Sequence, residues 1–167
     1  TNFVVKLYSI YENKMKKRVI HWFRNDLRLA DNPALHEASA SDEVIPIYIL
    51  TPEIMSGLGQ ASKIWLHHSL YKLNESTGFK IAFYKGNPKE VLAEITQVEK
   101  VQRIFWNKIF EPHHHASDEE LVSELKIMGT SCKSFNGSLL WEPSSILKKD
   151  GTPYKVFTPF YRKGGLF

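Results

Sequence analysis

The stretch that decides the fold is VIHWFRNDLRLADNPAL, residues 19–35. Residues 19–23 are apolar or aromatic apart from His21, a composition that predicts a short strand in the core of a sheet. Asn32 and Pro33 predict the start of a helix to about residue 40, because asparagine caps helices and proline is favoured at their first position. The stretch therefore indicates a strand followed directly by a helix, the building unit of a parallel α/β sheet.

The same unit recurs along the chain. Strands are expected at 44–50, 81–84, 103–106 and 132–135, with helices between them at about 60–75, 88–98 and 117–128. Two capping boxes, Asn87 with Glu90 and Ser117 with Glu120, mark the starts of the last two helices. This order predicts an α/β fold: a doubly wound, Rossmann-like, five-stranded parallel sheet with helices on both faces. Glycines and prolines after residue 135 then predict an extended C-terminal arm.

Composition excludes several classes of protein. The 167 residues suit one domain, and 43% hydrophobic with 24% charged residues is typical of a globular protein. No apolar run approaches the roughly 20 residues of a membrane span, so no membrane partner is expected. Cys132 is the only cysteine, which excludes a disulfide framework or multi-cysteine zinc site and favours a reduced, cytoplasmic location. The histidine tract 113–115 is interpreted as a loop before a helix, so no metal is expected.

The formal net charge of +4 suggests nucleic-acid binding, but its distribution argues against a DNA-reading surface on the sheet. Residues 1–18 and 144–167 each carry a net charge of +4, whereas residues 19–143 carry −4. Only 5 of the 22 basic residues are arginine, the residue best suited to bidentate contacts with phosphates and bases. The basic charge therefore belongs to the two ends of the chain.

Ligands of doubly wound sheets bind outside the carboxyl ends of the strands. The turn after residue 23 contains no glycine, which argues against a glycine-rich dinucleotide-binding turn. It carries two arginines and two aspartates, which form either an ion-pair network that docks another element or a solvated charged surface. At the end of the fourth predicted strand, Trp106 and Asn107 predict a place where a flat ligand stacks and is hydrogen-bonded.

Taken together, these motifs resemble the DNA photolyase/cryptochrome family. The opening motif is HWFRNDLRLADNPAL at residues 21–35. Further segments match in order: PIYIL at 46–50, SKIWLHHSL at 62–70, FWNKIFEP at 105–112, SFNGSLLWEP at 134–143 and GTPYKVFTPF at 151–160. The resemblance covers about residues 18–163, and its first and last motifs are long and specific.

The resemblance implies the light-harvesting domain of a deoxyribodipyrimidine photolyase. In this family an α/β domain holds an antenna chromophore, either a folate such as methenyltetrahydrofolate or a deazaflavin or flavin. A helical C-terminal domain holds FAD, which repairs pyrimidine dimers in DNA by light-driven electron transfer. The expected organisation is a leader, added or edge segment at 1–16, an antenna domain at 17–135 and an arm at 136–167 toward that FAD domain. Because the family resemblance assigns FAD and DNA binding to that C-terminal domain, this chain is expected to contain no catalytic residue. It is also not expected to repair DNA alone.

Matching the family motifs residue by residue implies two sets of site residues. The antenna-binding set comprises Arg24, Thr51, Lys63, Trp106, Asn107 and Glu111. The interdomain or structural set comprises Asp26, Arg28, Asp31 and Asn32. Where folate-binding relatives often carry Asn-Glu, this chain has His113-His114.

Two alternative functions stay open at this point. One is the corresponding domain of a cryptochrome-type blue-light photosensor, and the other is a stand-alone nucleotide-binding α/β protein. An apolar face that normally docks the FAD domain also predicts self-association of this chain.

Overall fold

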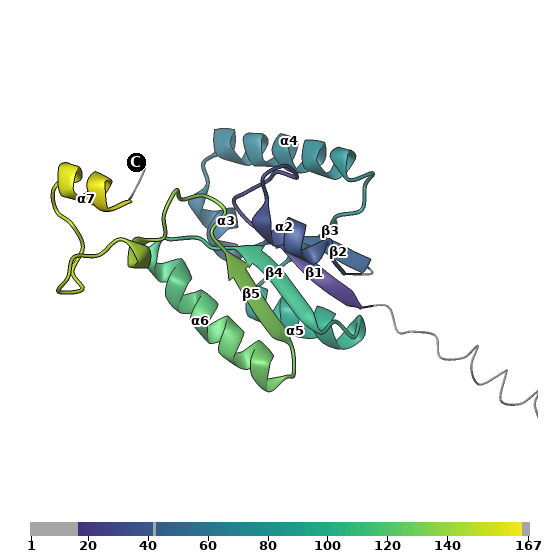
Figure 1. Ribbon diagram of the computed structural model, residues 1–167. Helices are drawn as coiled ribbons and strands as arrows, with labels where there is room; N and C mark the ends of the chain where they lie inside the picture. Colours follow the sequence, from purple (N-terminus) through teal and green to yellow (C-terminus); the bar gives the residue numbers. More distant parts are fainter. Residues whose placement is uncertain (1–16, 42, 165–167) are drawn as a thin grey trace, which may run out of the picture.

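Five parallel strands form the centre of the molecule (Figure 1). The computed structural model describes residues 17–41 and 43–164, without the side chains of residues 112, 113 and 115, so the expected leader or edge segment 1–16 lies outside the described residues. The strands are β1 (Arg18–Phe23), β2 (Glu43–Leu50), β3 (Ala82–Lys85), β4 (Arg103–Asn107) and β5 (Ser131–Phe135). Their order, β3-β2-β1-β4-β5, with every neighbouring pair parallel, confirms the predicted sheet.

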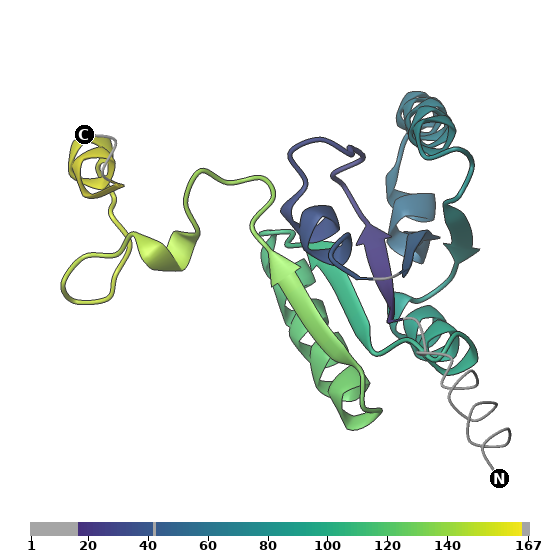
Figure 2. The same ribbon diagram turned by 45° about the vertical axis from the view of Figure 1, so that its right-hand side comes forward.

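Helices cover both faces of the sheet (Figure 2). One face carries α2 (Pro33–Ala38) and α4 (Gln60–Ser76), and the other carries α5 (Pro88–Val98) and α6 (Pro112–Ile127). The buried side chains of α5 and α6 pack in one core cluster with alternate residues of the strands: Leu92, Ile95, Leu121 and Leu125. The predicted doubly wound architecture is therefore confirmed.

The central strand β1 supplies side chains to both cores. Its residues 19–23 are between 0 and 4% exposed. Ile20 and Trp22 pack on the α5–α6 side, whereas Val19 and Phe23 pack on the opposite side. Burying one such side chain stabilises a protein by about 1.5–3 kcal/mol. This two-sided burial explains why the strand is almost continuously apolar.

The start of α6 differs from the prediction. The helix begins at Pro112 rather than at Ser117, so the capping box at Ser117 and the loop at 113–115 were wrong predictions. Proline is favoured in the first turn, where a helix needs no N–H from it. Ser117 and Asp118 consequently lie inside the helix, and the Asp118 carboxylate is bonded to Arg24 instead of capping the helix.

A short helix at the end of β2 was not predicted. In α3 (Pro52–Gly57) the hydroxyl of Thr51 accepts a hydrogen bond from the Ile54 amide at 3.3 Å, and Pro52 follows the cap. Threonine before proline is a regular signal for a helix start. The helix carries the chain away from the carboxyl end of β2 and forms one side of a cavity described below.

The strand order reverses between β1 and β4, which places the topological switch point at their carboxyl ends. Beyond β5 the chain forms η1 (Pro143–Ser145), an antiparallel bridge between Leu147 and Pro153, and α7 (Phe157–Gly164). Figures 1 and 2 both show α7 at the far end of this arm, away from the sheet. Among the described residues, no helix combines the length and apolarity needed to cross a bilayer.

Candidate functional site

A network of polar side chains closes the switch point. Asn107, at the end of β4, is 3% exposed, and its amide donates to Asn32 Oδ1 at 2.8 Å and to the Asp26 carboxylate. Asn107 Oδ1 accepts from the Ala34 amide at 3.3 Å, and Asn32 Oδ1 accepts from the Leu35 amide at 3.0 Å. These bonds join the β1–α2 turn to β4, so the crevice between the two strands is filled by the protein itself.

A second contact holds the start of the arm against the same turn. The Arg28 guanidinium donates to the carbonyl of Asp31 at 2.9 and 3.1 Å and to the carbonyl of Gly137. Gly137 lies so close to Asn107 that a Cβ at this position would stand 2.6 Å from the Asn107 Cγ. The charged turn therefore docks the start of the arm, but through hydrogen bonds of Arg28 to backbone carbonyls and of Asp26 to Asn107 rather than through the expected ion-pair network.

A cavity of about 560 Å³ opens beside this network, and we call it the β1–β2 cavity. It lies between the carboxyl ends of β1 and β2, the helix α3 and the first turns of α5 and α6. Its wall includes Trp22, Arg24, Tyr48, Thr51, Ile54, Gly57, Lys89, Ile109, Asp118 and Glu120. Ligand cavities in proteins commonly measure about 300–1,000 Å³, so this one suits a small organic molecule.

Arg24 is the electrostatic centre of the β1–β2 cavity. Its guanidinium lies 4.6 Å from the centroid of the Trp22 ring and bonds to the Asp118 carboxylate at 2.6 Å. The side chains of Arg24 and Asp118 are only 7 and 18% exposed, so the pair is screened little by water. The stacked indole and guanidinium give the cavity a flat and rigid wall.

The wall of the β1–β2 cavity carries a second set of charges. Lys89 pairs with Glu120 at 3.2 Å and with Glu124, and hydrogen bonds to Glu124 and Glu120 raise the pKa of the Lys89 ammonium. Burial raises the pKa of the Tyr48 hydroxyl in the cavity wall. Tyr48 thus stays neutral at physiological pH, and the cavity combines neutral aromatic groups with paired charges.

A neighbouring cavity of about 790 Å³, the β4–β5 cavity, lies between β4, β5, α6 and η1. It is lined by Trp106 and by the ion pair of Lys108 with Glu142, whose charged atoms are 2.7 Å apart. Ile109 and Asp118 belong to the walls of both cavities. The β1–β2 and β4–β5 cavities are therefore adjacent.

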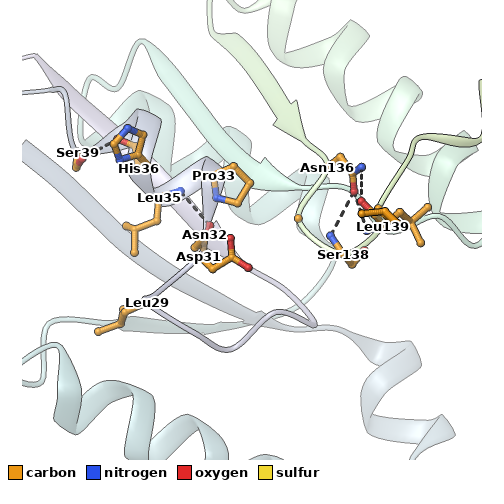
Figure 3. Close-up of a pocket in the computed structure, with 12 residues that line it drawn as sticks. Leu29, Asp31, Asn32, Pro33, Leu35, His36, Ser39, Asn136, Ser138 and Leu139 are labelled. Atoms are coloured by element: carbon orange, nitrogen blue, oxygen red, sulfur yellow. Dashed lines mark hydrogen bonds between the residues drawn. The ribbon is translucent and has the colours of Figure 1, made fainter. Parts of the chain in front are cut away.

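A third hollow of about 890 Å³ lies beside α2 (Figure 3). The β1–α2 turn and α2 form one side of it, with Leu29, Asp31 and His36, and the loop after β5 forms the other. In that loop the Asn136 side chain accepts hydrogen bonds from the amides of Ser138 and Leu139. Figure 3 shows the drawn side chains of the two sides separated by a gap, and the Arg28 guanidinium, which is not drawn there, bonds to Asp31 on one side and to Gly137 on the other.

The structure separates the predicted antenna-binding residues. Arg24 and Thr51 lie in the wall of the β1–β2 cavity, and Trp106 lies in the wall of the β4–β5 cavity. Asn107 belongs to the polar network. The remaining two of the set, Lys63 on α4 and Glu111 before α6, are exposed and line none of the cavities described above.

The predicted interdomain or structural set lies together in the β1–α2 turn. Asp26 and Asn32 belong to the polar network, and Arg28 bonds to the carbonyls of Asp31 and Gly137. Asp31 adopts a positive φ of 50°, a conformation that aspartate tolerates better than most residues. In the described part of the chain, no group of three or more side chains is placed to hold a metal ion.

Sequence reasoning missed much of the β1–β2 cavity wall. The sequence pattern places Trp22 and Tyr48 in core strands and Lys89 at the start of a helix, and it does not indicate that the three line one cavity. The signal that was available is positional: the last residues of β1 and β2 and the first residues of the following helices meet at one edge of a parallel sheet.

Comparison with known proteins agrees with this fold. The family model described as DNA photolyase matches residues 19–164. A deoxyribodipyrimidine photo-lyase of Agrobacterium fabrum is 39% identical over 148 residues, which are 86% of this chain and 31% of that protein. Cryptochrome-2 of Arabidopsis thaliana is 33% identical over 156 residues, or 90% of this chain and 26% of that protein.

Solved structures show the same likeness. The crystal structure of a class III photolyase from Agrobacterium tumefaciens superposes with a TM-score of 0.83 at 37% identity, covering 93% of this chain and 33% of that one. An archaeal photolyase from Sulfolobus tokodaii, described with two FAD molecules and a novel light-harvesting cofactor, gives a TM-score of 0.70 at 25% identity and covers 87% and 34%. The chain thus spans about a third of the length of these relatives. Its sequence and fold place it in the DNA photolyase family.

Proposed function

We propose that the chain is the light-harvesting domain of a deoxyribodipyrimidine photolyase and that it holds its antenna chromophore in the β1–β2 cavity. The observation that carries this proposal is the flat wall of Trp22 and Arg24 inside a cavity large enough for a fused aromatic ring system. The bound chromophore supplies absorption of light and transfer of the excitation energy. The residues of this chain bind the chromophore and orient it.

The residues of the β1–β2 cavity fit such a group. The planar Arg24 guanidinium covers the ring of the buried Trp22, and its pair with Asp118 offers a donor and an acceptor fixed in place. Tyr48, 3% exposed, supplies apolar surface and a hydroxyl that stays protonated. These side chains bind and orient the ring and exclude water from one of its faces.

Among the residues that the structure describes, the cavity wall has no exposed cluster of unpaired cations that would suit a phosphate. Arg24 is paired with Asp118, and Lys89 is paired with Glu120 and Glu124. This charge pattern favours a ring system without a phosphate group, as in folate, riboflavin or deazaflavin, for the enclosed part of the ligand. It leaves the choice between these three chromophores to direct binding measurements.

Titration of the purified chain with riboflavin and with methenyltetrahydrofolate, followed by ligand fluorescence, tests this proposal. Gly57 lines the cavity and has no heavy atom within 4 Å of an added Cβ, so Gly57→Phe narrows the cavity without disturbing the core. It is expected to weaken binding by about tenfold or more, equivalent to about 1.4 kcal/mol.

Gly59 provides the matched control. It also has no heavy atom within 4 Å of an added Cβ, but it lies outside the wall of the β1–β2 cavity. Gly59→Phe is expected to leave the affinity unchanged. Failure of both ligands to bind, or equal affinities for the two variants, would refute the assignment of the chromophore to this cavity.

For the full-length protein that contains this chain, we propose repair of pyrimidine dimers in DNA by FAD bound outside the chain. The 39% identity to a photolyase, against 33% to a cryptochrome, favours repair over photosensing. Loss of dimers from irradiated DNA should require blue light and the intact flavoprotein. An FAD-loaded full-length protein that repairs no dimers would instead support the photosensor.

A further inference from the structure

The outer edge of the sheet at β3 carries exposed aromatic side chains. In the described part of the chain β3 has one neighbouring strand, β2, so its other edge is free. Phe83 on this strand is 48% exposed, and Phe79, just before the strand, is 60% exposed. Phe79 lies against the half-exposed Tyr71 of α4, with 6.2 Å between the ring centroids. Exposed aromatic groups beside a free edge strand are typical of an interface with another chain.

The backbone of Phe79 is a second unusual feature of this edge. Its φ is +59°, in the left-handed region that bulky residues rarely adopt. Residues held in this conformation gather at functional sites, because the surrounding contacts have to compensate its cost. In the described chain Phe79 nevertheless presents most of its side chain to solvent. A contact that covers this side chain would supply the compensation.

The backbone of β3 offers hydrogen-bonding groups along the same edge. The Gly86 amide donates to the Leu50 carbonyl at 3.2 Å, so Gly86 faces β2. Successive residues of a strand turn their N–H and C=O groups to opposite sides. Those of Tyr84 therefore also face β2, whereas those of Phe83 and Lys85 face outward. The edge can accept a further strand at these two residues.

The arm of this chain does not cover the edge. The arm follows β5, which forms the opposite edge of the sheet. Figures 1 and 2 both show α7 on the far side of the molecule from β3. The edge at β3 is also separate from the β1–β2 and β4–β5 cavities, since neither Phe79 nor Phe83 lines them.

We propose that two copies of this chain associate through this edge, with β3 of one copy pairing antiparallel to β3 of the other. The two copies are related by a twofold axis normal to the sheet, which is the symmetry of an isologous edge-to-edge dimer. This axis keeps the faces that carry α4 on the same side of the joined sheet. The proposal is independent of the bound chromophore.

The strand is complementary to itself when Phe83 lies opposite the partner's Phe83. Both residues then exchange N–H···O=C bonds through their outward groups. Phe83 packs near Tyr48 on the face that carries α4, so the two Phe83 rings meet on that face as a cross-strand aromatic pair. Lys85 lies opposite the partner's Ile81, so no like charges face each other.

The same register places a projecting ring opposite a hollow. The partner's Phe79 lies level with Asn87, next to Gly86, on the face that carries α4. A hollow of about 370 Å³ lies beside this position and is lined by Leu50, Pro52, Met55, Ser56, Lys85 and Gly86. The twofold axis repeats the contact, so each copy turns its Phe79 toward the hollow of the other. A second copy therefore fits the edge, because it supplies both the strand and the ring.

Sedimentation equilibrium of the purified chain tests the proposal, and a dimer that dissociates on dilution is expected. Phe83→Glu and Phe83→Lys each place like charges opposite one another across the axis. Each should raise the dissociation constant of the dimer about tenfold or more. An equimolar mixture of the two variants should dimerise again, because opposite charges then face each other. Neither unfolding nor an interface elsewhere on the chain would produce this rescue.

Two more variants separate the interface from general effects. Ile127→Glu on α6 replaces a side chain that is 86% exposed and does not belong to the β3 edge, so it should leave the dimer unchanged. Phe79→Asn should weaken association without lowering the stability of the monomer, because asparagine tolerates a positive φ better.

Three results would overturn the proposal. The first is an unaltered chain that stays monomeric at about 0.1 mM. The second is a dimer that persists in both Phe83 variants, since self-association then uses another face. The third is a chain that dimerises only after removal of residues 1–16, because that segment would then be the occupant of the edge.

Discussion

His21 should make the stability of this protein depend on pH. The residue lies in the central strand β1 and has no exposed surface. Its ring packs edge-on against Phe23, with 4.4 Å between the ring centroids, and both of its ring nitrogens lack hydrogen-bond partners among the described residues. Burial lowers the pKa of His21 from 6.5 to about 4, because a charged imidazolium has no solvation there. The unfolded chain therefore binds a proton at a higher pH than the folded chain.

The size of the effect follows from the two pKa values. Between pH 6.5 and pH 4 the unfolded state holds the proton and the folded state does not, so the free energy of unfolding falls as the pH falls. Relative to pH 8, the loss is about 2 kcal/mol at pH 5 and about 3 kcal/mol at pH 4. Below pH 4 this contribution stops growing, because the folded protein is protonated as well.

Urea unfolding followed by tryptophan fluorescence at pH 8, 6, 5 and 4 measures this loss. His21→Leu removes the titrating group while keeping a buried side chain of similar size, and it should remove about 2 kcal/mol of the loss at pH 5. His36→Gln, an exposed histidine on α2, serves as the control and should keep the full loss. Carboxylates that interact with neither histidine titrate in all three chains and cancel in the comparison. Equal pH dependence in the unaltered chain and His21→Leu would refute the reasoning.

One labelling experiment and two substitutions test other parts of the structure. Burial raises the pKa of Cys132 to about 11, so iodoacetamide at pH 8 should label this thiol much more slowly in the folded chain than in urea, as followed by mass spectrometry. Gly137→Ala should lower the free energy of unfolding by about 1–3 kcal/mol in urea titrations, because its Cβ would stand 2.6 Å from Asn107 Cγ. Asp118→Asn should lower it by about 3 kcal/mol in the same titrations, because it leaves the Arg24 charge buried without a counterion; no loss would show that water reaches Arg24.

Local patterns were sufficient to predict the sheet and most helices. The apolar run of β1 and the caps at Asn32 and Asn87 act within a few residues, and the structure shows both asparagine side chains accepting from the first helical turn. The start of α6 was missed because Ser117 fits a capping pattern and Pro112 fits a helix start equally well. In the helix that begins at Pro112, Asp118 bonds to Arg24, 94 residues away in the sequence. Such a distant contact leaves no signal in the local sequence.

The candidate site was harder to predict because its walls come from distant segments. Position in a family motif does not say toward which side a helical residue points, and Lys63 lies on the exposed side of α4. Trp106 was expected to stack on a ligand at the end of β4, but its side chain is 1% exposed and packs in the core cluster with Leu121 and Leu125 of α6. Likewise, only the fold brings Trp22 and Arg24 opposite Asp118.

The closed switch point explains why the site lies to one side of it. In many doubly wound folds a phosphate binds here on free backbone N–H groups at a helix start. In this chain the amides of Ala34 and Leu35 are bonded to the side-chain oxygens of Asn107 and Asn32. The Asp26 carboxylate, held by Asn107, adds a negative charge that repels phosphate. With this position occupied, the proposed ligand site is the cavity flanked by β2 and α3, where paired charges and aromatic rings suit a ring system rather than a phosphate.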